Sequence, residues 1–68
     1  MAEFYIDKAE QSNGEHLVHF ANCKTLATNT DTIYLGSIAS FESARAEGKR
    51  LYNAVNACSA CAGQYVAG

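Results

Sequence analysis

Three apolar runs separated by polar segments occupy the first half of the chain, and each predicts a β-strand. The runs are rich in aromatic and β-branched residues and read EFYID (3–7), HLVHF (16–20) and TIYLGSI (32–38). Between the first two, Asn13-Gly14 can take the positive φ angles of a tight turn. Gly36 in the third run marks a bulge or a close approach of another backbone. We therefore expect a three-stranded antiparallel sheet that begins with a hairpin.

A helix is expected after the third run. Ser40 is a suitable N-cap, and Glu42 places a negative charge in the first turn, where the helix dipole favours it. An apolar stripe at helical spacing should lie on the sheet; it consists of Phe41, Ala44, Gly48, Leu51 and Val55. The segment NAVN (53–56) forms helices poorly and predicts an exit loop. The expected fold is one α+β domain over residues 1–68, with residues 64–68 as a disordered tail.

Charge and hydropathy narrow the classes of partner. The formal net charge is −2, and five basic residues are spread along the chain, so no electrostatic footprint for nucleic acid is present. The first residues carry acids before any apolar run, unlike a secretory signal. No apolar stretch approaches the ~20 residues that a membrane helix needs. We expect a cytoplasmic monomer that binds neither nucleic acid nor membrane, with another protein as the open class of partner.

The short chain makes the three cysteines candidates for a stabilising role. A chain of 68 residues has a marginal hydrophobic core, and natural domains of this size often carry a disulfide or a metal ion. Cytosolic thiols stay reduced, and three cysteines cannot all pair within one chain. Metal ligation or redox chemistry therefore explains them better than disulfides do.

Two residue pairs have the spacing of metal ligands, namely His19-x3-Cys23 and Cys58-x2-Cys61. Structural zinc takes four Cys or His ligands, commonly as two short pairs brought together by the fold. CxxC is the stronger signal, and HxxxC alone is weak. Together they form a Cys₃His set that uses every cysteine, so we expect these four residues to bind a structural zinc ion. Strand alternation points His16 and His19 to opposite faces, so His16 should stand outside the site.

Three alternatives remain open. A thiol-redox or other cysteine enzyme could use Cys58 and Cys61, but redox activity needs a CxxC between a strand and a helix N-terminus. Here the pair follows the predicted helix. Cys23 and His19 could form a nucleophile pair, but no third group is available to orient them. The third alternative is a metal-free domain with incidental thiols.

Two further sets of residues are expected to be structural. Asp7, Glu10 and Glu15 fall in the hairpin region, where exposed acids keep a protein in solution. The aromatic residues should pack the core and the sheet rather than stack on bases; they are Phe4, Tyr5, Phe20, Tyr34, Phe41 and Tyr52.

The segments FYIDKAEQSNGEHLVHFANCKTL, IYLGSI and CSAC resemble a family of small bacterial proteins. These proteins share an aromatic first strand, an Asn-Gly-Glu/Asp-His turn, a Val-His-x3-Cys step, a Tyr-Leu-Gly strand and a terminal CxxC. The resemblance covers Phe4 to Cys61 and implies a fold, but the family has no established biochemical activity. This chain departs at Asn56-Ala57, where members often have Asn-Gly. Its last segment, AGQYVAG, also lacks the further Cys and His that members frequently carry.

More distantly, the layout is similar to the N-terminal metal-binding domain of the Ada methylphosphotriester DNA repair protein. That domain binds zinc through a C-x3-C step and a CxxC, and the four residues at its ligand positions correspond here to His19, Cys23, Cys58 and Cys61. His19 stands where the Ada domain has its methyl-accepting cysteine, and Ser59-Ala60 replace basic residues. The resemblance therefore implies a zinc scaffold without methyl transfer. We expect an interaction or accessory module rather than an enzyme.

Overall fold

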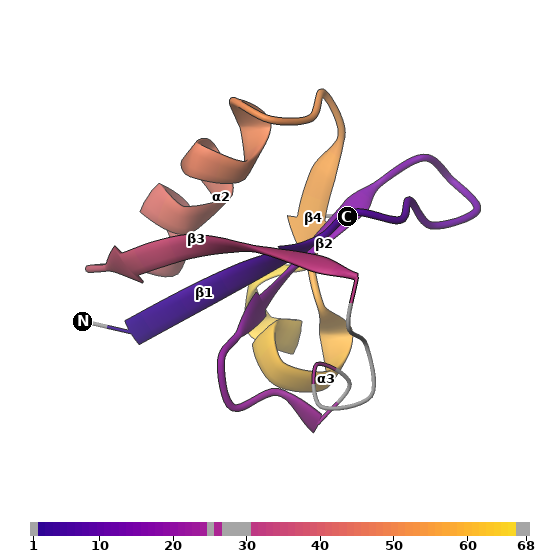
Figure 1. Cartoon of the computed structure of the whole chain (residues 1–68). Helices are drawn as coiled ribbons and strands as arrows, with labels where there is room; N and C mark the ends of the chain where they lie inside the picture. Colours follow the sequence, from indigo (N-terminus) through magenta and orange to yellow (C-terminus); the bar gives the residue numbers. More distant parts are fainter. Residues whose placement is uncertain (1, 25, 27–30, 67–68) are drawn as a thin grey trace.

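The computed structural model describes residues 2–24, 26 and 31–66. Its elements are β1 (Ala2–Asp7), β2 (His16–Phe20), β3 (Thr32–Ile38), α2 (Phe41–Lys49), β4 (Val55–Ala57), α3 (Ser59–Ala62) and the 3₁₀ helix η1 (Gly63–Tyr65). The strands form one sheet in the order β3-β1-β2-β4 (Figure 1). Within the part of the chain that the structure describes, no helix has the length and apolar character needed to cross a bilayer.

The sheet is mixed rather than purely antiparallel. β1 pairs antiparallel with both β2 and β3, as the three apolar runs predict. The expectation of three strands and one helix is too simple, because Val55–Ala57 forms a fourth strand parallel to β2 and a short second helix, α3, follows it. A strand of three residues is too short to show a recognisable alternation of apolar and polar positions. It is defined by its hydrogen bonds to β2, which lies far away in the sequence.

Glycine permits two irregular points in the sheet. Gly14, in the turn between β1 and β2, has a φ of 87°, and the turn is closed by a hydrogen bond from the Gln11 amide to the Glu15 carbonyl (2.7 Å). Between Phe4 and Tyr5 the register with β3 shifts, which leaves β3 with an extra residue beside Gly36. Gly36 has a φ of 123°, a conformation that residues with a Cβ rarely adopt.

α2 begins as predicted and ends earlier than the apolar stripe suggests. The Ser40 hydroxyl accepts a hydrogen bond from the Ser43 amide (3.2 Å), which caps the helix. A Cβ built on Gly48 would lie 3.0 Å from Ile6 Cδ1, so the helix lies close against the sheet at this position. The helix ends at Lys49, and Leu51 is 51% exposed. The stripe therefore stops at Gly48, because Val55 leaves the helix and pairs with His16 in the sheet.

The core lies between α2 and the adjoining face of the sheet. The ring centroid of Phe41 lies 5.8 Å from that of Phe4 and 5.7 Å from that of Phe20. In η1, Tyr65 stacks on Phe41 at 4.6 Å. Of the segment predicted to be a tail, Gln64 and Tyr65 thus belong to η1, and residues 67–68 lie outside the described residues.

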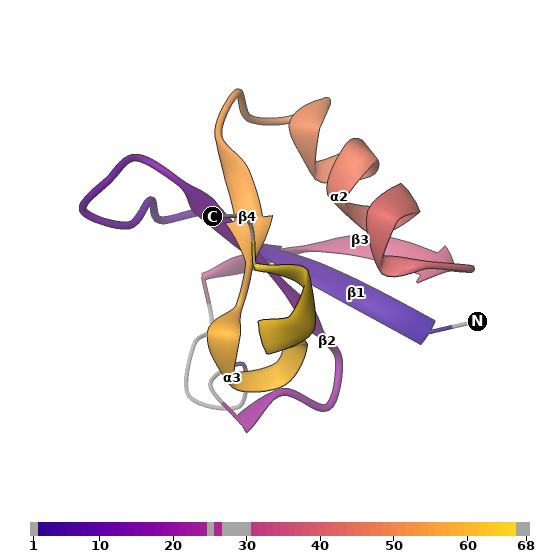
Figure 2. The same cartoon turned by 180° about the vertical axis from the view of Figure 1, so that it is seen from behind.

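The two sides of the sheet carry different side chains. In both views α2 lies beside β1 and β3, whereas α3 lies beyond the end of β4 (Figure 1, Figure 2). Ile6 and Val18 are paired and fully buried in the core. The next pair, Tyr5 and His19, therefore points to the other face. There Tyr5 contacts Tyr34, which is 52% exposed, so this aromatic pair packs on the sheet surface and not in the core.

The bulge gives a test of the sheet geometry. Gly36→Ala should lower the free energy of unfolding by about 1–3 kcal/mol, since the φ of 123° strains any residue with a Cβ. Gly63→Ala is the matched control. It has a φ of −55°, and a Cβ at either glycine meets no atom within 4 Å. Urea unfolding at one fixed metal concentration measures both variants, and equal losses would contradict the bulge.

Candidate metal centre

β2 places the only histidine of the site. His19 pairs with Tyr5 across the β1–β2 ladder and is 2% exposed, on the face of the sheet away from the Ile6–Val18 pair. One residue later the strand ends at Phe20. The position of His19 is thus set by strand alternation and by the register of the hairpin.

The turn after β2 brings Cys23 back toward His19. The Cys23 amide donates to the Phe20 carbonyl (3.0 Å), and the Leu26 amide donates to the Cys23 carbonyl (3.2 Å). Lys24 and Leu26, which follow Cys23, are helical. Cys23 is buried.

β4 brings the two cysteines of the CxxC close to His19 and Cys23. The parallel ladder pairs Val18 with Ala57, and the Cys58 amide continues it by donating to the Val18 carbonyl (3.0 Å). Cys58 is the N-cap residue of α3, whose first hydrogen bond runs from the Ala62 amide to the Cys58 carbonyl (2.8 Å). Cys61 lies three residues further on this single turn, so both thiols face the end of β2.

All four predicted residues come together. The ligand atoms of His19, Cys23, Cys58 and Cys61 lie within 4.8 Å of one another. The Sγ atoms of Cys23 and Cys58 are 3.8 Å apart, and two thiolates at about 2.3 Å from one tetrahedral zinc ion would be about 3.8 Å apart. All three cysteines are free thiols. The donor set and its spacing therefore fit a tetrahedral zinc ion.

The surroundings raise the pKa values of two of the four residues, Cys61 and His19. Burial, together with the neighbouring Cys23, raises the pKa of the Cys61 thiol to about 12. Burial alone would lower the pKa of His19, but its hydrogen bond to Asp7 and its contact with Cys23 outweigh burial and raise that pKa above the usual value. Without a metal ion, Cys61 is therefore a protonated thiol at neutral pH.

The expected position of the CxxC needs a correction. The pair follows α2, but it also stands at the junction of strand β4 and α3, with Cys58 as the N-cap of α3 and Cys61 inside it. Redox CxxC motifs use a similar junction of strand and helix N-terminus. Its environment is nevertheless unlike a redox site. Cys58 is 3% exposed, and the raised pKa of Cys61 leaves it a poor nucleophile.

His16 lies apart from the cluster. Its ring stacks on Tyr52 with centroids 3.6 Å apart and planes 7° apart, and its Nδ1 donates to the main-chain oxygen of Asp7 (3.0 Å). The group of four ligand residues does not include it. The structure thus places the two histidines in different environments, as strand alternation predicts.

Asp7 is the residue whose role the sequence did not reveal. It was expected to be an exposed, solubilising acid of the hairpin, which is wrong: Asp7 is 4% exposed, and its Oδ1 lies 2.8 Å from Nε2 of His19. Glu10 is exposed, and Glu15 is half-buried and accepts a hydrogen bond from Asn56 Nδ2 (3.1 Å). Asp7 lies two residues after Tyr5, so the two side chains project from the same face of β1. This spacing points to His19 only when it is known that Tyr5 pairs with His19.

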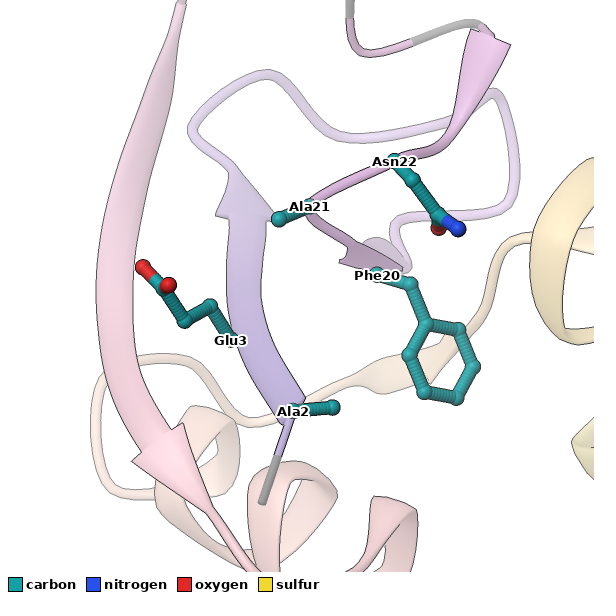
Figure 3. Close-up of a pocket in the computed structure, with 5 residues that line it drawn as sticks. All are labelled: Ala2, Glu3, Phe20, Ala21 and Asn22. Atoms are coloured by element: carbon teal, nitrogen blue, oxygen red, sulfur yellow. The ribbon is translucent and has the colours of Figure 1, made fainter.

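A shallow hollow lies beside the cluster but does not contain it. It has a volume of about 220 Å³ and is lined by Ala2, Glu3, Phe20, Ala21 and Asn22. Figure 3 shows Phe20 and Asn22 pointing to the same side while Glu3 extends toward β3. One carboxylate and one amide that point apart make no catalytic arrangement in this hollow.

Comparisons of the chain with protein-family models, with curated proteins and with solved structures find no match.

The two histidines should respond differently to substitution. His19→Ala removes a ligand atom of the cluster and should weaken zinc binding at least about tenfold. His16→Ala removes a ring that stacks on Tyr52 and donates to the main-chain oxygen of Asp7, so it removes no ligand atom and should leave the affinity within about twofold. Competition with a chromophoric chelator measures both. Similar losses in the two variants would contradict the assignment of His19 as the ligand.

Zinc affinity should rise with pH. A zinc ion at this site would bind thiolate and neutral imidazole. It would therefore have to displace the proton of Cys61 and, toward acid, the proton of His19, whose pKa is also raised. Each displaced proton strengthens apparent binding by about tenfold per pH unit below the pKa of its group. Affinity should therefore increase from about pH 6 to about pH 8, in chelator competition corrected for the chelator's own protonation. A flat profile would exclude thiolate ligation.

Proposed function

We propose that this protein binds one zinc ion through His19, Cys23, Cys58 and Cys61, and that it is a bacterial cytoplasmic interaction or accessory module. The observation that carries the proposal is the convergence of four donor atoms within 4.8 Å. They come from the end of β2, the turn after it and the first turn of α3. Soft thiolates with one imidazole suit zinc.

The role proposed for the ion is structural. Structural zinc sites fill all four positions with protein ligands, whereas catalytic sites keep one position open for water or substrate. The four residues here supply a complete set, and three of them are buried. A zinc ion so enclosed would tie the end of β2 to α3 and leave the surface to contact a partner.

Charge makes nucleic acid an unfavourable partner in this proposal. The formal net charge is −2, and two of the five basic residues are paired within α2 or at its end: Arg45 with Glu42 (3.2 Å) and Arg50 with Glu47 (3.1 Å). Such a surface offers a polyanion little electrostatic attraction, so a protein partner fits the proposal better. We therefore assign the module to protein contacts.

A thiol-redox function is the second candidate, and the position of the CxxC at the junction of β4 and α3 is the observation that favours it. Against it stand the burial of Cys58 and the raised pKa of Cys61, because thiol exchange needs an accessible thiolate. A redox pair would cycle between dithiol and disulfide without any metal. The two candidates therefore differ in metal content.

One experiment separates them. Protein purified under reducing conditions without chelator should contain one zinc per chain by elemental analysis, and cobalt substitution should give tetrahedral d–d bands with thiolate charge-transfer bands. Cys61→Ser should weaken the charge-transfer bands, and Ser59→Ala, a neighbour outside the ligand set, should not. A metal-free protein whose Cys58 and Cys61 oxidise reversibly would replace the zinc proposal with the redox one.

A further inference from the structure

The carboxylate of Asp7 contacts the cluster from behind its histidine. Asp7 is the last residue of β1, and its Oδ1 lies 2.8 Å from the Nε2 atom of His19. Both side chains are almost completely removed from solvent. Asp7 lies outside the group of four ligand residues and contacts one of them, His19.

We infer that Asp7 is a positioning residue of the metal centre, whose carboxylate keeps the proton of His19 on Nε2 and so presents Nδ1 to the metal. This inference rests on the zinc-binding function proposed above. An ionised carboxylate only accepts hydrogen bonds, so the nitrogen that faces it carries the proton. A neutral imidazole has one N–H, and the other nitrogen keeps its lone pair. Nδ1 is therefore the ligand atom.

The strand register explains why position 7 can do this. Ile6 pairs with Val18 and Tyr5 pairs with His19, so Asp7 and His19 project from the same face of the hairpin as diagonal neighbours. A carboxylate one residue earlier, at the position of Ile6, would point to the other face of the sheet. The contact therefore belongs to the fold of the β1–β2 hairpin itself.

Electrostatics supply the reason for burying an acid here. A buried carboxylate is unfavourable unless it is paired and hydrogen-bonded. A metal ion on Nδ1 would polarise the ring and make the Nε2 proton a stronger donor, and in return the carboxylate would make the ring a stronger ligand. The pair is thus most favourable when the cluster holds a cation.

The same residue holds His16 in the opposite tautomer. The main-chain oxygen of Asp7 accepts from Nδ1 of His16 (3.0 Å), and a carbonyl oxygen can only accept. Because this contact uses the backbone, substitution of the Asp7 side chain leaves it in place. His16 therefore serves as an internal reference for the tautomer of His19.

The test combines one substitution with ring-nitrogen NMR. Asp7→Asn keeps the shape of the side chain but removes its charge, and the amide can donate to Nε2 and so favour the wrong tautomer. Zinc affinity should fall by roughly 10–100-fold at unchanged stoichiometry. Glu3→Gln makes the same chemical change at an exposed position of the same strand and should leave the affinity unaltered.

The wild-type protein gives a readout that does not depend on the variant folding. With ¹⁵N-labelled histidine and cadmium-113 in place of zinc, metal–nitrogen coupling should appear at Nδ1 of His19, and Nε2 should be protonated. Coupling at Nε2, or an Asp7→Asn variant that binds zinc as tightly as wild type, overturns the inference alone. A wild-type chain that takes up no zinc or cadmium overturns the proposed function and the inference with it.

Discussion

β4 reaches the free edge of β2 when the chain turns back after α2, and the Cys58 amide then donates to the Val18 carbonyl (3.0 Å). This parallel pairing places a segment near the C-terminus beside the strand that carries His19. Three residues of ladder are a weak tie by themselves, since short strands depend on packing and side-chain contacts for their stability. A metal ion bound by Cys58 and Cys61 together with His19 and Cys23 would link β4 and α3 to β2 and so stabilise this pairing.

The hairpin divides the chemistry between its two faces. One face carries Ile6 and Val18 into the apolar core under α2, and the other carries His19 and Asp7. Strand alternation thus separates hydrophobic burial from polar ligation within five residues of β2. A one-residue slip of register would put His19 into the core and Val18 at the cluster. The core packing and the ligand geometry therefore fix the same register.

The sequence predicted those parts of the structure that depend on residues close together in the chain. The three apolar runs, the Ser40 cap and the glycine bulge all follow from neighbouring residues, and ligand spacing sufficed to predict which side chains gather. β4 could not be predicted, because its hydrogen bonds lie with β2 and not within its own sequence. The burial of Asp7 was missed for a similar reason, since only the pairing of β1 with β2 brings it to His19.

A metal ion at the cluster would hold β4 and α3 against β2, and amide hydrogen exchange with and without a chelator measures whether it does. With metal bound, the amides from Val55 to Ala62 should exchange slowly; after chelation under reducing conditions they should exchange much faster. Amides within α2 should change far less, because that helix is anchored by Phe41 against Phe4 and Phe20. Equal protection of residues 55–62 in both conditions would contradict this role of the metal.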